Sequence, residues 1–278
     1  MNGTLLATDI DGTLLRSDGT VSDRTRAALR AADDAGLDVV FVTGRPPRWL
    51  DVLVEPTGYR GVAIGANGAV LYDVGAAEIL SAETLSPPVL RAIGTELRTA
   101  FPHVQFALEY GQFALEYGLG FGAEPQYVHD WDINPPYDRH GQPVAPPRVA
   151  SFEEISDEPA VKLLAKVRDL DSDGFLAAAT ELVGDRASVT TSSSFGLLEI
   201  ASRGVTKATG LATLAASRGV AREDVIAIGD MPNDLPMLEW AGRSYAVANG
   251  HPDVRAAADE VTVSNDEDAV ARLIESLL

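Results

Sequence analysis

The sequence predicts an α/β fold built on a parallel sheet, with a second, α+β domain inserted into it. Near both ends of the chain, apolar runs of strand length alternate with helical stretches, which is typical of a parallel sheet. Between about residues 82 and 193 this alternation gives way to mixed strands and helices and a long Gly- and Pro-rich loop. We therefore expect a core made of residues 1–81 and 194–278, and an inserted domain at 82–193.

Composition narrows the class of protein. Apolar residues make up 46% of the 278 residues, which is enough for a large core, and the net charge is −19. That charge argues against nucleic acid or an anionic membrane as partner, because both bind basic surfaces. The chain has no cysteine, so disulfides and thiol chemistry are excluded. With no leader pattern and no run of about 18 apolar residues, we expect a cytoplasmic protein.

The first predicted strand ends in two aspartates. The apolar run from Leu5 leads to Asp9 and Asp11, and Gly12 follows in an Asp-Gly turn. Ligands of open α/β sheets bind at the carboxyl ends of strands. Two carboxylates this close repel each other, and a divalent cation or a phosphoryl group would relieve the repulsion. An ordinary strand end with a common turn is the plainer interpretation.

The next strand also ends in a polar turn. Ser22 is a good N-cap for an alanine-rich helix, and the apolar run 37–42 then predicts a strand. Thr43, Gly44 and Arg45 follow directly, so a hydroxyl, a glycine and a cation stand at this strand end.

A third strand is expected at 62–66, with Asn67-Gly68 as a hairpin turn into 69–72. The inserted domain comes next. Its expected elements are helices at 86–100 and 173–183, strands at 104–110, 113–117, 161–167 and 187–191, and a long loop at 118–147.

The core pattern returns near residue 197. A helix is predicted at 206–217, with Lys207 in its first turn, where a cation opposes the helix dipole and needs a local reason. The strand 225–228 is followed by a polar turn that contains Asp230, Asn233 and Asp234. The remaining expected elements are a strand at 245–248 and helices at 252–258 and 266–277.

In a parallel sheet these three strand ends meet at one edge. Carboxylates, a hydroxyl, a lysine and glycine-flanked amides would then line one crevice. Hard carboxylate oxygens suit Mg²⁺, which also binds substrate phosphate.

These places, in this order, make the sequence resemble the haloacid dehalogenase superfamily, and more closely its Cof-type phosphatases. The resemblance covers essentially the whole chain and implies a Rossmann-like core with a large inserted α+β cap. The matching segments are Asp9-Ile10-Asp11-Gly12-Thr13, Thr43-Gly44-Arg45, Ala66-Asn67-Gly68-Ala69, the Phe-Ala-Leu-Glu-Tyr-Gly stretch, Leu198-Glu199-Ile200, Lys207, and Gly229-Asp230-Met231-Pro232-Asn233-Asp234.

The resemblance implies a Mg²⁺-dependent phosphomonoester hydrolase that acts on a small phosphorylated metabolite. Asp9 would be the nucleophile that forms an aspartyl-phosphate, and Asp11 the general acid and base. Asp9, the carbonyl of Asp11 and Asp230 would hold Mg²⁺, with Asp234 bound directly or through water. The implied phosphate-binding residues are Gly12, Thr43, Gly44, Arg45, Lys207 and Asn233, of which Thr43 and Lys207 also count as catalytic.

Taken singly, these residues have plainer interpretations. Thr43 could cap a turn, Lys207 could be a surface lysine, and Asp230 and Asp234 suit a helix N-terminus. Arg45 fits an ion pair with an acidic side chain as well as a substrate contact.

The inserted domain supplies expected substrate contacts and one irregularity. A direct repeat occupies 106–111 and 113–118; the second copy leads into a family-like continuation, so we interpret the first copy as the insertion. Ordinary strand and loop surface is the plainer interpretation of the contact candidates. These candidates are Glu116, Glu124, Tyr127, Trp131 and Lys162.

Two other functions stay open. A phosphomutase of the same superfamily uses the same nucleophile but needs basic cap residues, and this cap is acidic. A non-catalytic phospho-ligand sensor predicts a damaged nucleophile or metal ligand, which the sequence lacks. Sugar phosphates, nucleotides, flavin mononucleotide and pyridoxal phosphate all remain as substrates, and the protein is expected to be a monomer or homodimer.

Overall fold

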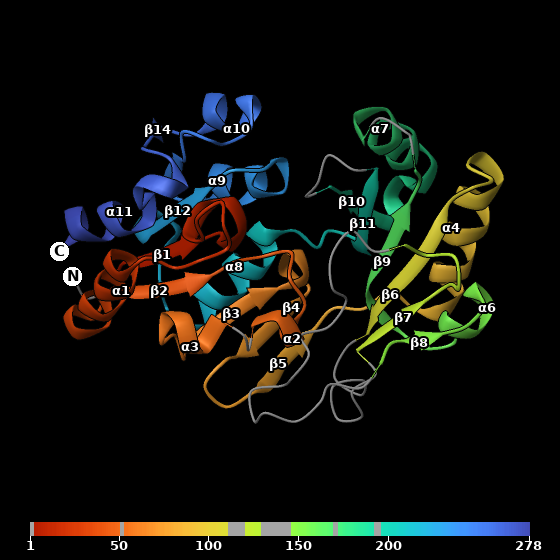
Figure 1. The fold of residues 1–278 in the computed structure, drawn as a ribbon, viewed down its shortest axis with the longest axis horizontal. Coiled ribbons are helices and arrows are strands. Elements are labelled where there is room, and N and C mark those ends of the chain that lie inside the picture. Colours follow the sequence, from red (N-terminus) through yellow and green to blue (C-terminus); the bar gives the residue numbers. More distant parts are fainter. Residues whose placement is uncertain (1–2, 51–52, 111–119, 129–145, 169–171, 192–195) are drawn as a thin grey trace. The chain divides into compact units, whose positions relative to one another are not determined.

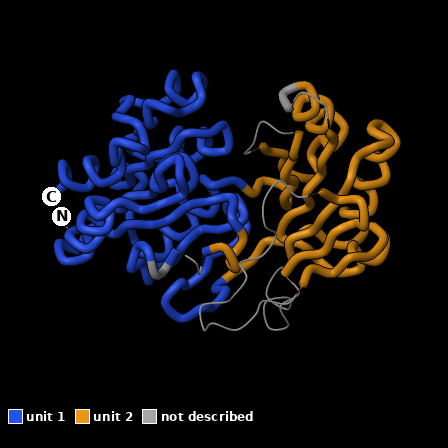
Figure 2. Tube along the Cα trace, viewed as in Figure 1, with its two compact units in different colours: residues 1–45, 50–80, 206–278 blue, residues 46–49, 81–205 orange. Residues whose placement is uncertain are grey.

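A computed structural model describes residues 3–50, 53–110, 120–128, 146–168, 172–191 and 196–278. The chain forms two compact units (Figure 2). Unit 1 comprises Met1–Arg45, Leu50–Leu80 and Thr206–Leu278, and unit 2 comprises Pro46–Trp49 and Ser81–Val205. Unit 2 is thus inserted into unit 1, as the change of pattern in the sequence predicts.

Unit 1 is built on a five-stranded, fully parallel sheet in the order β14-β13-β12-β1-β2 (Figure 1). Since β1 lies between β12 and β2, the carboxyl ends of the three strands that carry polar turns are neighbours. The strands are β1 (Leu5–Thr8), β2 (Asp38–Phe41), β12 (Val225–Gly229), β13 (Arg243–Ala246) and β14 (Glu260–Val261).

Helices cover this sheet on both faces. Leu5 and Ala7 belong to a buried cluster with Leu211 of α8 and Met237 of α9, and Leu6, fully buried, points to the opposite face. Helices α1 and α11 pack together and are joined by an ion pair at their surface. The helices of unit 1 are α1 (Asp23–Ala35), α3 (Val54–Thr57), α8 (Lys207–Ser217), α9 (Leu235–Trp240), α10 (Pro252–Ala257) and α11 (Ala269–Leu277), and α2 (Pro47–Leu50) crosses a unit boundary.

The predicted hairpin after β2 is confirmed. Strands β3 (Val62–Gly65) and β4 (Val70–Asp73) pair antiparallel around a turn at 66–68, and β5 (Glu78–Ala82) completes this small sheet. The hairpin continues the main sheet, because the Thr43 amide donates to the Ile64 carbonyl at 2.8 Å and a parallel bridge joins Val42 to Ile64.

Unit 2 holds a six-stranded mixed sheet in the order β10-β11-β9-β6-β7-β8. Its central strand pairs are antiparallel, whereas β7 and β8 run parallel. Helices α4, α6 and α7 bury one face, where Phe106, Leu163 and Ile200 meet Ile93 and Phe175. The elements are α4 (Pro87–Ala100), β6 (Gln105–Tyr110), β7 (Phe121–Ala123), β8 (Arg148–Val149), α6 (Phe152–Ile155), β9 (Ala160–Lys166), α7 (Ser172–Val183), β10 (Ala187–Thr190) and β11 (Leu197–Ser202).

Two expectations about this unit differ from the structure. The second core segment was expected from residue 194, but unit 1 resumes only at Thr206, because β11 pairs with β9 in the sheet of unit 2. The first repeat copy, which we interpret as an insertion, is part of the sheet: residues 106–110 lie in β6, between β9 and β7. The whole of the second copy, 113–118, lies outside the described residues.

Helices suited to crossing a membrane are absent from the described ranges, since none of them is both long and apolar enough.

Candidate active site

The polar turns of β1, β2 and β12 meet at one edge of the sheet, as the strand order requires. Asp9 follows β1 directly, and its amide donates to the Ile228 carbonyl of β12 at 3.0 Å. Thr43 stands two residues beyond β2, and Asp230 one residue beyond β12. The sequence-predicted juxtaposition of these three turns is therefore present in unit 1.

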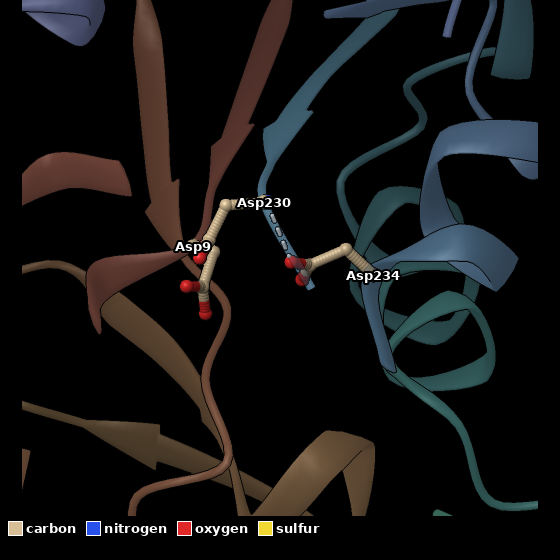
Figure 3. Close-up of side chains that lie close together, drawn as sticks. All are labelled: Asp9, Asp230 and Asp234. Carbon is tan, nitrogen blue, oxygen red and sulfur yellow. Dashed lines mark hydrogen bonds between the residues drawn. The ribbon is translucent and has the colours of Figure 1, made fainter. Parts of the chain in front are cut away.

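Three carboxylates form the centre of the site (Figure 3). One carboxylate oxygen from each of Asp9, Asp230 and Asp234 lies within 4.8 Å of the others, and all three side chains are buried. Burial, reinforced by repulsion from Asp234, raises the pKa of Asp230 to about 6. Burial also raises the pKa of Asp9, although Lys207 opposes the shift. Such a cluster favours a bound cation.

Lys207 is the cation of this cluster. Its Nζ donates to Asp9 Oδ1 and to Asp234 Oδ1, each at 2.6 Å, and its side chain is only 1% exposed. Burial alone would lower the pKa of Lys207, but Asp234 and Asp9 hold it above its ordinary value. This explains a lysine at the first position of α8: it is no surface residue, and two acceptors compensate for the unfavourable dipole.

Backbone and hydroxyl donors fix the other carboxylates. Asp234 Oδ2 accepts the amides of Asp230 and Met231, each at 2.9 Å, so Asp234 caps the turn that carries it. Thr13 Oγ1 donates to Asp230 Oδ1 at 2.7 Å. This role of Thr13 in holding Asp230 was not predicted, and its place in the first motif is the one signal that could have suggested it.

Gly12 is held against Asp230. Its φ of +79° suits glycine, and a Cβ built there would overlap Asp230 Oδ2. We expect Gly12→Ala to displace Asp230 and to lower the melting temperature further than backbone strain alone would, measured by thermal denaturation.

Gly19→Ala is the matched control. Gly19 has nearly the same φ of +78° but no atom within 4 Å of a built Cβ, so this variant carries the backbone strain without the collision. Equal melting temperatures of the two variants would contradict the expected displacement.

Arg45 and Asp11 form a second ion pair in the site, beside the contacts of Lys207. Arg45 Nε donates to Asp11 Oδ2 at 2.7 Å, and its other guanidinium nitrogen contacts Asp11 Oδ1. The ion-pair interpretation of Arg45 is therefore confirmed. Asp11 is half-exposed and lies outside the buried trio. Lys207 binds Asp9 and Asp234 of that trio and not Asp11.

Asn233 and Thr43 are held by neighbouring turns. Asn233 Nδ2 donates to Asn67 Oδ1 at 3.1 Å, and both side chains are buried. Thr43 Oγ1 accepts the amide of Arg45 at 3.1 Å, which shows the capping role that was the plainer interpretation.

Among the described residues, the expected substrate contacts in the inserted domain do not gather at one site as the core residues do. Lys162 is buried and pairs with Glu199 at 2.7 Å, and Glu124 accepts both Arg98 and the Phe106 amide. Both therefore have structural partners inside unit 2. Tyr127 is buried edge-on to Phe121. Glu116 and Trp131 lie outside the described residues.

One buried pair escaped the sequence analysis. Arg48 binds Glu109 with two contacts, one of 2.9 Å, and its guanidinium lies over the ring of Phe121. Both charged side chains are almost fully buried. Glu109 belongs to the repeat copy that was set aside as an insertion, which is why this pair was missed.

Comparison with known proteins finds a family whose match includes all of these motifs. The family of haloacid dehalogenase-like hydrolases matches residues 6–274. The chain belongs to this family. The match spans both the strand-end carboxylates and the inserted unit, so the expected parallel-sheet core with an inserted α+β segment is the fold of a haloacid dehalogenase-like hydrolase.

Relatives of this hydrolase cover its whole length. It is 30% identical to a phosphoglycolate phosphatase of Natronomonas pharaonis, with 97% of this chain and 96% of that protein aligned. It is 29% identical to the 5-amino-6-(5-phospho-D-ribitylamino)uracil phosphatase YwtE of Bacillus subtilis, over 98% and 97%. A solved haloacid dehalogenase-like hydrolase of B. subtilis superposes with a TM-score of 0.78 at 27% identity, over 99% and 100%.

Proposed function

We propose that this hydrolase removes phosphate from a small phosphorylated metabolite, through an aspartyl-phosphate on Asp9 and with Mg²⁺ as cofactor. One observation carries the proposal: Lys207 Nζ lies 2.6 Å from Asp9 Oδ1 inside a buried carboxylate trio. A buried nucleophilic carboxylate held by a cation is suited to attack an anionic phosphorus centre. The phosphatase names of its full-length relatives support the same reaction.

The residues divide the chemistry between them. Asp9 attacks phosphorus, and the bond to the leaving oxygen breaks while Asp11 gives that oxygen a proton. Water then attacks the same phosphorus, Asp11 takes a proton from it, and the bond to Asp9 breaks. Lys207 has three N–H donors, of which two bind Asp9 and Asp234. The third N–H is proposed to bind a phosphoryl oxygen.

The carboxylate trio fits Mg²⁺. Its donors are hard oxygens that converge from two neighbouring strand ends, and burial disfavours their charges without a cation. Asp9, Asp230 and the carbonyl of Asp11 would hold the ion, with Asp234 bound directly or through water. The ion would neutralise charge that develops on the phosphoryl oxygens.

Asp11 needs a partner change to act as the acid. In the described state its carboxylate is engaged by Arg45. We propose that a bound phosphate dianion competes for Arg45, which frees the Asp11 carboxylate to take up a proton from water and give it to the leaving oxygen. Gly12, Gly44 and Thr43 would add backbone or hydroxyl donors to the phosphate, as the family resemblance implies.

We propose that unit 1, the core, carries out the chemistry and that unit 2, the cap, selects the substrate. The relatives' names include phosphoglycolate and a phosphoribitylamino-uracil, which are small phosphorylated metabolites. The net charge of −19 argues against a nucleic-acid substrate. A metabolite phosphomonoester is therefore the proposed substrate class.

Phosphate release tests the proposal. We expect the wild-type protein to release inorganic phosphate from 4-nitrophenyl phosphate with Mg²⁺, and to lose this activity when a chelator removes the ion. Restoring Mg²⁺ restores release. A folded protein that releases nothing from this ester or from a panel of metabolite phosphates would contradict the hydrolase proposal and favour the sensor.

A further inference from the structure

The turn at 66–68 has a strained backbone. Ala66 and Asn67 both have positive φ, at +50° and +57°, and neither is glycine. Left-handed backbone is uncommon for alanine, so the surrounding structure has to hold it. Asparagine adopts this conformation more readily, but its side chain here is only 4% exposed. A buried polar side chain on a strained turn next to a reactive site calls for a specific role.

Two motifs clamp this turn through the backbone. The Ala66 amide donates to the Arg45 carbonyl and the Asn67 amide to the Thr43 carbonyl, both at 2.9 Å. On the other side, a Cβ at Gly68 would overlap the Thr206 carbonyl, next to Lys207. The turn is therefore fixed between the loop after β2 and the start of α8.

The side chain of Asn67 reaches a third motif. Its Oδ1 accepts from Asn233 Nδ2 at 3.1 Å, and Asn233 precedes Asp234, which binds Lys207. Because Asn67 presents an oxygen, Asn233 must turn its NH₂ group toward it and its carbonyl away. Among the described residues, that buried carbonyl, Asn233 Oδ1, has no hydrogen-bond partner. A buried acceptor of this kind is costly unless a bound molecule supplies a donor.

We propose that Asn67 is a positioning residue, which sets the amide of Asn233 so that Asn233 Oδ1 accepts an O–H group of a bound molecule. The proposal rests on the proposed hydrolase function and deepens it. The O–H donor belongs either to a substrate hydroxyl or to the attacking water. Asn67 itself acts on the reaction only through Asn233.

A double-mutant cycle on kcat and kcat/KM tests this role. Asn67→Gly removes the side chain and keeps the positive φ without strain, and Asn233→Ala removes the partner. We expect each single variant to lower one of these two constants about tenfold, the loss of one hydrogen bond. In the Asn233→Ala background, Asn67→Gly should change nothing further, because its target is gone.

Two substrates identify the donor. If kcat/KM falls for glycerol phosphate but not for 4-nitrophenyl phosphate, which has no hydroxyl, the donor is a substrate hydroxyl. If kcat falls equally for both esters while kcat/KM is unchanged, the donor is the attacking water, because water acts only after the leaving group has departed. Either pattern supports the positioning role, provided that the cycle shows coupling.

Ala77→Gly is the matched control. Ala77 also has a positive φ, of +59°, on an exposed turn of unit 1, and its replacement should leave kcat and kcat/KM unchanged. A fall in melting temperature for Asn67→Gly, with equal losses of kcat or of kcat/KM in both backgrounds, would overturn the positioning role in favour of a purely structural one. Wild-type protein without turnover would instead defeat the hydrolase proposal and this one with it.

Discussion

Asp9→Asn is expected to abolish turnover, with kcat at least about a thousandfold below wild type, because the amide cannot form an aspartyl-phosphate. The same variant should remain folded. Asn keeps an oxygen for Lys207 Nζ, which binds Asp9 Oδ1 at 2.6 Å. Phosphate release and thermal denaturation, run on the same preparation, measure both effects.

The stability of the Asp9 variant follows from the direction of the pKa shift. Burial raises the pKa of Asp9, so above the ordinary aspartate pKa of about 4 its ionised form destabilises the folded, metal-free protein. A neutral amide removes this cost, and at pH 7 without Mg²⁺ the melting temperature should equal or exceed that of wild type.

Asp33→Asn is the control for this substitution. Asp33 is an exposed carboxylate on α1, and its replacement should change neither kcat nor the melting temperature. If Asp9→Asn kept more than a few per cent of wild-type turnover, Asp9 would not be the nucleophile.

Lys207→Met is expected to have the largest effect on stability. It leaves Asp9 and Asp234 buried without their shared cation, and removing one partner of a buried ion pair costs about 3–5 kcal/mol in the free energy of unfolding. Turnover should also fall more than about a hundredfold, since the proposed contact of Lys207 with a phosphoryl oxygen would be lost. Urea denaturation and phosphate release check the two parts.

A second substitution separates repulsion from packing. In the variant that combines Asp9→Asn with Lys207→Met, one buried charge is gone, so the double variant should be more stable than Lys207→Met alone. If the double variant is equally unstable, the loss comes from packing around the lysine stem and not from unpaired carboxylates.

The core site could be predicted because its chemistry is local to strand ends. Asp9, Thr43 and Asp230 each follow an apolar strand, and parallel strands place such turns at one edge. The partners that hold these residues could not be predicted in the same way. Thr13 binds Asp230, 217 positions away, and Asn67 binds Asn233, 166 positions away; neither pair has a local signal.

The roles of residues in unit 2 were harder to predict, because charged side chains there form ion pairs within the unit. Lys162 and Glu124 had the polar character of substrate contacts, yet each is paired within the unit. The repeat added a second difficulty. Two copies with the same strand propensity compete for one place in the sheet, and only the pairing of Glu109 with β7 and β9 assigns the first copy to it.

The strand order also determines when the sheet of unit 1 can be completed during synthesis. β1 is paired on one side by β12, which is translated about 220 residues later, on the order of ten seconds or more at about 5–20 residues per second. Nearly all of unit 2 is made in between, as one continuous stretch with its own core. During that interval the apolar edge of β1 has no native neighbour on that side. A ribosome-bound chain should therefore depend on chaperones to protect this edge until β12 emerges.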